Sequence, residues 1–188
     1  MPRPDAASLC ATILTPRLRI EPIAARHAAF LFEGLQDAAI YEWISMVRPT
    51  KIETLTARWA NITERALASR ADLDIGWAVQ RLHDGAWIGK LDAFVEPNGI
   101  ARNVGYLFLP TYWRCGYASE AVAAMCNHLA EHDIVEQRAT VTVGNDASGR
   151  VLERAGFTRT RIIVGNDTIR GVAVDDIEYV RRDPVRIE

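Results

Sequence analysis

The sequence predicts a single α/β domain in which helices flank a mixed sheet. Several short segments alternate apolar and polar residues, as half-buried strands do. Other segments repeat apolar residues every three or four positions, which is the spacing of an amphipathic helix. The two patterns are interleaved along 188 residues, a length that suits one domain with a sizeable core.

The first third of the chain is expected to contain one strand and two helices. Residues 1–12 are interpreted as a flexible leader, and the alternating residues of Ile13–Ile23 predict the first strand. A short helix is expected within Ala24–Gln36. Thr50 and Glu53 have the spacing of a capping box, which predicts a long helix ending near Arg70.

The middle of the chain predicts a meander followed by the central strand and helix. Val104–Leu109 is apolar and aromatic, and Pro110 ends this strand because proline cannot donate to a ladder. A helix follows, since one apolar face recurs at spacings of four, three and four residues: Ala118, Val122, Met125 and Leu129. The meander strands before it are expected at Ile75–Gln80 and Trp87–Val95.

The last part of the chain predicts a strand, a short helix and a closing hairpin. The β-branched segment Ala139–Val143 is the strand, and Ala147–Ala155 is the helix. The hairpin strands are expected at Phe157–Val164 and Val172–Val180, with a turn at Gly165-Asn166-Asp167. Periodicity alone does not give the order in which these strands pair.

Composition excludes several functional classes. The formal net charge is −2, whereas a nucleic-acid groove needs clustered Lys and Arg. No apolar run has the length of a membrane span, and residues 1–5 lack the apolar core of a signal peptide. Cys10, Cys115 and Cys126 do not have the spacing of metal ligands. We therefore expect a cytoplasmic protein without a metal, a nucleic-acid partner or a membrane partner.

Gly116 marks a candidate anion site at the start of the central helix. A helix N-terminus offers unpaired backbone N–H groups and the positive end of a dipole. A glycine there allows an anion to approach the backbone closely. The order of strand, turn and helix therefore fits a phosphate or pyrophosphate site. A single glycine before a helix is also common where it only ends a loop and binds no ligand.

Two motifs resemble those of the GCN5-related N-acetyltransferase (GNAT) family. Tyr112-Trp-Arg-Cys-Gly-Tyr-Ala-Ser-Glu-Ala121 resembles motif A, and the pattern from Asn145 through Ser148 to Gly156-Phe157 resembles motif B. Leu14–Arg19 is similar to the opening of the branch that includes the ribosomal-protein N-terminal acetyltransferases RimJ and RimL. The resemblance bounds a domain at residues 13–182, with a tail at 183–188.

The resemblance implies an acetyl-CoA site between two parallel central strands that splay apart, here Val104–Leu109 and Ala139–Val143. The pantetheine arm would lie along the first strand, and the pyrophosphate would lie on backbone N–H groups between Arg114 and Ser119. Asn145 would fix the cofactor arm or the strand end, or simply form a turn. The implied cofactor-binding residues are Leu107, Phe108, Leu109, Arg114, Cys115, Gly116, Tyr117, Ala118, Ser119, Asn145 and Ser148.

The resemblance also implies direct attack of an amine on the thioester, without an acyl-enzyme at Cys115. A backbone N–H near Leu109 would stabilise the oxyanion. Ser148 would hydrogen-bond the leaving thiolate, or it would only cap the following helix. Asn103 stands where relatives often carry a glutamate base, and an amide cannot take a proton at neutral pH. The alternatives are a water relay at Asn103 or a base supplied by His83, Glu42 or Asp92.

Two functions remain open at this stage. The first is an acetyl-CoA-dependent N-acetyltransferase that acts on a primary amine, either a protein N-terminus or a small molecule. The second is a non-catalytic acyl-CoA-binding or sensing domain, which Asn103 favours. Motif B, with Ser148 in place, favours the enzyme. A homodimer is a further expectation that the residues do not decide.

Overall fold

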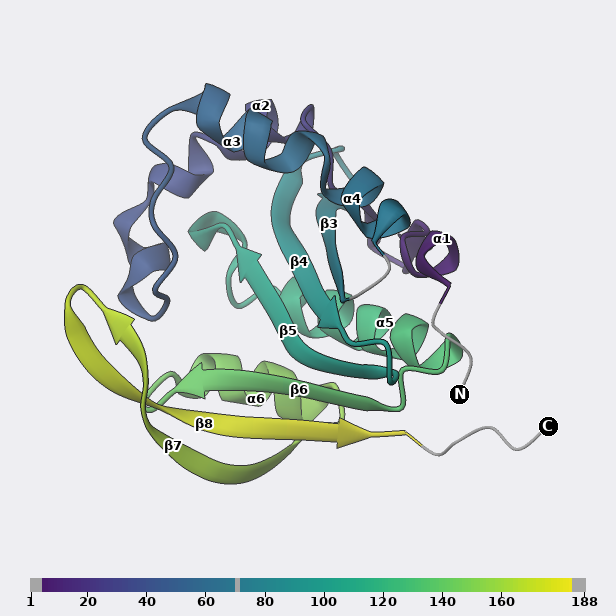
Figure 1. Cartoon of the computed structure of the whole chain (residues 1–188). Coiled ribbons are helices and arrows are strands. Elements are labelled where there is room, and N and C mark those ends of the chain that lie inside the picture. Colours follow the sequence, from purple (N-terminus) through teal and green to yellow (C-terminus); the bar gives the residue numbers. More distant parts are fainter. Residues whose placement is uncertain (1–4, 70–71, 184–188) are drawn as a thin grey trace.

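A mixed sheet runs through the whole molecule (Figure 1). We describe residues 5–69 and 72–183 of a computed structural model, and within them the sheet has eight strands in the order β1-β2-β3-β4-β5-β6-β8-β7. The strands are β1 (Ile13–Leu14), β2 (Leu18–Pro22), β3 (Leu73–Arg81), β4 (Trp87–Val95), β5 (Ile100–Phe108), β6 (Glu136–Thr142), β7 (Thr158–Ile169) and β8 (Val172–Arg182).

β5 and β6 are the parallel pair of this sheet, and they separate soon after they begin. Their ladder joins only Ile100 to Glu136 and Ala101 to Gln137. Every other pairing of the sheet is antiparallel. Beyond Ala101, β5 stays bonded to β4 and β6 stays bonded to β8, so the sheet opens between them. The expected splay of two parallel central strands is therefore confirmed.

Helices cover both faces of the sheet. One core packs α5 and α6 against one face, and a second core packs α2 and α3 against the other. Among the described residues, no helix has the length and apolar character needed to cross a membrane. The helices are α1 (Ala6–Leu9), α2 (His27–Leu31), α3 (Ile52–Ala60), α4 (Ile62–Ala68), α5 (Tyr117–Glu131) and α6 (Asp146–Arg154), with short 3-10 turns η1 (Gly34–Gln36), η2 (Ala38–Glu42) and η3 (Pro110–Tyr112).

The described part of the expected flexible leader, residues 5–12, is instead packed on the domain. Asp5 caps α1 by accepting the N–H groups of Ala7 and Ser8. Leu9 is fully buried in the main core, and its carbonyl lies 3.1 Å from Nε2 of His128. Residues 1–4 of the leader and 184–188 of the tail lie outside the described residues.

Several other boundaries differ from the sequence predictions. The single strand expected over Ile13–Ile23 is divided into β1 and β2, because Thr15 Oγ1 accepts the Leu18 N–H and closes a tight turn. Thr50 does not cap α3. The N-cap is Lys51, without a side-chain hydrogen bond, so the hydroxyl of the expected capping box lies one position too early.

The long helix expected to reach Arg70 is divided at Asn61, which has φ −125° and ψ 19° and separates α3 from α4. Asparagine favours such a break because its side chain competes for backbone hydrogen bonds. The expected end at Arg70 lies outside the described residues.

The closing hairpin turns later than its sequence suggests. The turn lies at Arg170-Gly171, and the expected turn at Gly165–Asp167 is an irregularity inside β7. Carboxylates of β8 hold this irregularity in place. Asp175 accepts the Gly165 N–H at 2.8 Å, and Asp176 accepts from the Asn166 amide at 2.7 Å. Glycine, asparagine and aspartate occur in bulges as well as turns, so their cluster did not locate the reversal.

Candidate active site

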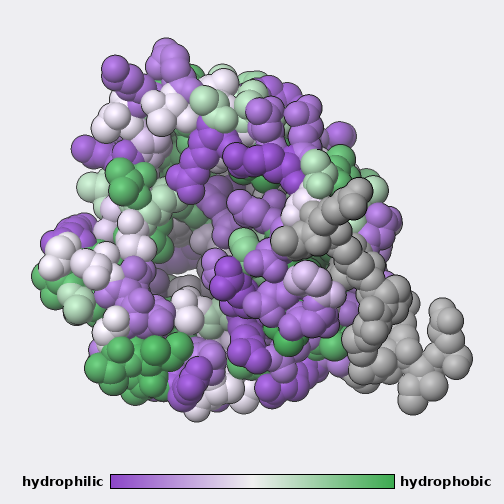
Figure 2. Space-filling model, viewed as in Figure 1, coloured by the Kyte–Doolittle hydropathy of each residue, from purple (hydrophilic) through white to green (hydrophobic). Residues whose placement is uncertain are grey.

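Only alternate residues of β5 have backbone N–H groups that β4 leaves unpaired, and Leu109 is not one of them. The Leu109 N–H donates to the Ile88 carbonyl of β4 at 2.9 Å, so the expected oxyanion donor is already occupied. Successive backbone N–H groups of a strand point to opposite edges. Phe108 and Tyr106 therefore present their N–H groups toward β6. Figure 2 shows a hollow in the molecule beside these separating strands.

Side chains of β5 divide between the two cores. Leu107 and Leu109 pack in the core under α2 and α3, whereas Phe108 is buried in the core shared with α5. The Phe108 carbonyl accepts the indole N–H of Trp113 at 2.6 Å, which is consistent with a carbonyl that β4 does not use. Of the three residues expected to bind pantetheine through their backbone, only Phe108 faces the opening.

The N-terminus of α5 is open to an anion. Gly116 is the N-cap with φ 80°, a left-handed conformation that glycine adopts without strain, and no side chain caps the helix. The first helical hydrogen bond runs from the Glu120 N–H to the Gly116 carbonyl. The N–H groups of Tyr117, Ala118 and Ser119 therefore lack partners within the helix. These are the amides that the sequence suggested for the pyrophosphate.

A set of hydrogen bonds fixes Arg17 beside Gly116. Arg17 Nε donates to Glu120 at 2.6 Å and an Nη donates to the Cys115 carbonyl at 3.1 Å. Thr15 also donates to Glu120, at 2.6 Å. Burial alone would raise the pKa of Glu120, but the bonds from Thr15 and Arg17 lower it overall. No motif in the sequence marks Arg17 as a binding residue, and its guanidinium lies at the start of α5 in an ion pair with Glu120.

The loop before Gly116 exposes two of the other expected cofactor residues. Arg114 has φ 60°, and its exposed side chain forms no ion pair with a described carboxylate. The exposed Cys115 thiol lies 3.4 Å from the Trp113 carbonyl. Arg114 and Gly116 both have positive φ values, so the chain turns sharply just before α5.

Ser148 at the start of α6 contacts Tyr106 of β5. The Tyr106 hydroxyl lies 2.6 Å from Ser148 Oγ and 2.9 Å from the Ser148 carbonyl oxygen. Burial raises the pKa of Tyr106, so its hydroxyl stays protonated. When that proton is donated to Ser148 Oγ, the serine proton is free to point into the opening. In the sequence Tyr106 has only the pattern of a strand residue, which does not reveal this contact.

Asn145, rather than Ser148, caps α6. Its side chain accepts the Ser148 N–H at 3.2 Å. The alternative role of Ser148 as a helix cap is therefore wrong. The expected turn role of Asn145 is close to what the structure shows, because its side chain accepts a hydrogen bond from the first turn of α6.

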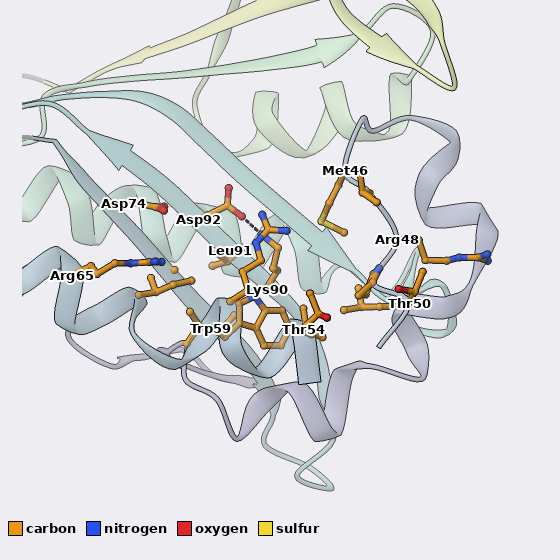
Figure 3. A pocket seen from close by; sticks show the side chains of 18 residues that line it. Met46, Arg48, Thr50, Thr54, Trp59, Arg65, Asp74, Lys90, Leu91 and Asp92 are labelled. Carbon is orange, nitrogen blue, oxygen red and sulfur yellow. Dashed lines mark hydrogen bonds and ion pairs between the residues drawn. The ribbon is translucent and has the colours of Figure 1, made fainter. Parts of the chain in front are cut away.

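A pocket of about 380 Å³ lies on the opposite face of the sheet, between α3, α4 and the strands β3 and β4 (Figure 3). Asp92 and Lys90 line it and form an ion pair through Asp92 Oδ1. Asp92 is opposite Gly105 of β5, and a Cβ on Gly105 would overlap Asp92 Oδ2. This carboxylate therefore reaches over the strand that borders the opening.

The other candidates for the base are placed less favourably. His83 lies in the exposed turn between β3 and β4, and Asn103 is exposed on β5 opposite Phe94. Glu42 lines a different cavity of about 410 Å³, together with Trp43 and residues of β6 and β8. Asp92 alone combines a carboxylate, the pocket and close approach to β5. Lys90, its partner, was not singled out from the sequence.

Comparison with known proteins places the fold in a family. The model of the acetyltransferase (GNAT) domain family matches residues 17–158. The uncharacterized N-acetyltransferase YoaA of Bacillus subtilis (strain 168) is 23% identical over 152 residues, which cover 79% of this chain and 84% of YoaA.

Solved structures of low sequence identity share the same fold. RimL, a ribosomal L7/L12 alpha-N-protein acetyltransferase in complex with coenzyme A, has a TM-score of 0.81 at 18% identity, with 91% of this chain and 97% of RimL covered. The ribosomal-protein-S5-alanine acetyltransferase from Vibrio fischeri has a TM-score of 0.81 at 16% identity, with 93% and 97% covered. The chain therefore belongs to the acetyltransferase (GNAT) domain family.

Proposed function

We propose that this protein transfers the acetyl group of acetyl-CoA to a primary amine by direct attack of the amine on the thioester. The observation that carries the proposal is the separation of β5 from β6 beyond Ala101, with the uncapped start of α5 beside it. A thioester held in that opening would be reachable from the pocket on the other face of the sheet, where Asp92 lies.

Coenzyme A would be held mainly by backbone groups. The diphosphate would accept the N–H groups of Tyr117, Ala118 and Ser119, with charge-assisted contacts from Arg17 and Arg114. The amides of the pantetheine arm would pair with the free edge of β5 at Phe108. Leu107 and Leu109 would support this edge from the core, since their backbone groups face β4.

The chemistry needs a base, an oxyanion donor and a partner for the leaving thiolate. The amine nitrogen bonds to the acetyl carbon and its proton passes to Asp92 Oδ2, directly or through one water. The backbone N–H of Tyr106 stabilises the oxyanion. The C–S bond then breaks, and the thiolate of coenzyme A accepts a hydrogen bond from Ser148. Asn103 takes no proton in this scheme.

The acceptor is either a protein N-terminus or a small-molecule amine. RimL is named for a protein α-amine, and the shared fold makes that class a reasonable first panel. We expect the reaction to take place in the cytoplasm. A homodimer remains an expectation to be checked by sedimentation.

The alternative is a domain of the same fold that binds acyl-CoA without turnover, and the specific observation that favours it is the amide at Asn103. Thiol release from acetyl-CoA with a panel of peptides and small amines separates the two functions. We expect release that depends on the amine, with acetylated product identified by mass spectrometry. Calorimetric binding of coenzyme A without transfer to any amine would instead support the sensor.

A further inference from the structure

The pocket beneath α3 and α4 carries an excess of positive charge. Four cations and two carboxylates line it: Arg48, Arg58, Arg65, Lys90, Asp74 and Asp92. The chain as a whole has a formal net charge of −2, so this excess is local. A cleft concentrates the electric field of the charges that line it, and a pocket of this sign therefore attracts anions.

Arginines of this pocket have no carboxylate partners of their own. Within residues 5–69 and 72–183, no ion pair involves Arg48, Arg58 or Arg65. In Figure 3, Arg65 extends along the pocket, whereas Arg48 points away from Lys90 and Asp92. A guanidinium matches a carboxylate with two parallel hydrogen bonds. Arg65 and Arg58 are thus available to a bound anion.

Asp92 supplies the complementary feature for an amine. Its Oδ1 pairs with Lys90, while its Oδ2 lies over Gly105 and has no hydrogen-bond partner in the described chain. Oδ2, on the side of Asp92 that faces β5, is therefore available to the reacting amine. The pocket therefore offers a carboxylate oxygen of Asp92 to an amine, and the guanidinium groups of Arg58 and Arg65 to an anion.

We propose that the acceptor is an amine with an acidic side chain close by, whose side-chain carboxylate is held through Arg58 and Arg65 while its amine lies at Asp92. This inference rests on the proposed acetyl transfer for its chemistry. A volume of about 380 Å³ is at the small end of ligand pockets and suits an acidic amino acid or the first residues of an acidic peptide. Both sources offer the same recognised group.

The test compares acceptors that differ only in charge. Glutamate is set against glutamine, and a peptide that begins Ser-Asp-Glu against one that begins Ser-Asn-Gln, with thiol release from acetyl-CoA as the readout. We expect kcat/KM for at least one acidic acceptor to exceed that of its amide partner by about tenfold or more. The amino-acid and peptide pairs distinguish the two sources.

Variants of the arginines show whether the pocket is responsible. Arg65→Gln and Arg58→Gln should raise KM for the acidic acceptor at unchanged kcat and reduce the preference to about twofold. Arg48→Gln, which removes a charge that points away, is the matched control and should keep the preference. Equal kcat/KM for acidic and amide acceptors would overturn the acidic class while leaving acetyl transfer intact.

A binding measurement covers the case in which no amine is turned over. Calorimetry with the same two peptides, in the presence of coenzyme A, does not depend on chemistry. Tighter binding of the acidic peptide that is lost in Arg65→Gln would support the pocket even if the proposed transfer fails. Indistinguishable binding of the two peptides would overturn the inference.

Discussion

Asp92 shows how a single residue acquires a role from its neighbours. Its carboxylate overlies Gly105, where any side chain would displace it, and its Oδ1 forms an ion pair with Lys90. The proposed role of Asp92 as the base thus depends on three residues from two strands. None of them carries a motif that would identify it alone.

Replacing Asp92 with asparagine should remove the base and keep the size of the side chain. We expect kcat to fall by about 10²- to 10⁴-fold, the usual contribution of a positioned base, with unchanged affinity for coenzyme A. Initial rates and calorimetry measure the two quantities. Asp74→Asn in the same pocket is the control, with less than about a threefold effect expected. Wild-type turnover in Asp92→Asn would move the base to another residue.

Ser148 and Tyr106 should behave as a unit. Ser148→Ala should lower kcat by about ten- to a hundredfold at nearly constant KM for acetyl-CoA, because only the departing thiolate needs the hydroxyl. Tyr106→Phe should have a smaller effect in the same direction, since it removes the bond that orients Ser148. The double variant should be no slower than Ser148→Ala. Additive losses from the two changes would show that the residues act independently.

At the scale of elements, a buried cluster joins β2 to α2. Glu21, which is 6% exposed, accepts hydrogen bonds from Arg19, Arg26 and His27. Burial raises the pKa of Glu21, but the bonds from Arg26, His27 and Arg19 outweigh it and lower the pKa to about 2. Burial also lowers the pKa of His27, whose Nδ1 accepts the Ala24 N–H.

Stability should therefore fall as the solution is acidified. The pKa of Glu21 is lower in the folded state than its ordinary value of 4.5, so its contribution is complete above pH 4.5 and is lost between about pH 4.5 and 2. The loss is on the order of 3 kcal/mol. His27 adds a loss of the same sign below its ordinary pKa. Urea unfolding of Glu21→Gln at pH 3–7 should show a flatter profile than the parent.

The surface pair of Glu96 with Arg102 provides the control for that experiment. Its two atoms lie 3.8 Å apart and the arginine is exposed, so Glu96→Gln should change the free energy of unfolding by less than about 1 kcal/mol. A parent protein whose stability is constant from pH 3 to 7 would contradict the assignment of Glu21.

The cofactor side of the molecule was more predictable than the acceptor side, for a physical reason. Motif A and motif B are local, so the sequence placed Gly116 at the start of α5 and Ser148 in α6. The partner of Asp92 depends on register. Simple counting around the turn at Glu96–Gly99 would place Asp92 opposite Asn103. In the structure Val95 already pairs with Ala101, one position further on, and an irregularity between Phe94 and Val95 adds a second position, so Asp92 lies opposite Gly105.

Long-range pairing explains the other differences. The Leu109 N–H is occupied because it lies on the edge of β5 that pairs with β4. The alternation of apolar and polar residues predicts which face of a sheet a side chain lies on, but it does not predict which neighbouring strand a backbone N–H group bonds to. Leu9 is buried because α4 and α5 offer it a site, which a short polar leader does not reveal. Arg58 and Arg65 of the pocket come from α3 and α4, a helix pair whose position over β3 and β4 has no local signal in the sequence.

The whole molecule is arranged around one opening, with amides of α5 on its cofactor side and Asp92 on the other. A crystal structure with bound coenzyme A tests this arrangement most directly. We expect the diphosphate on the N–H groups of Tyr117–Ser119 and the pantetheine arm between β5 and β6, with its sulfur near Ser148. Coenzyme A bound elsewhere, or β5 and β6 paired along their full length, would contradict the account.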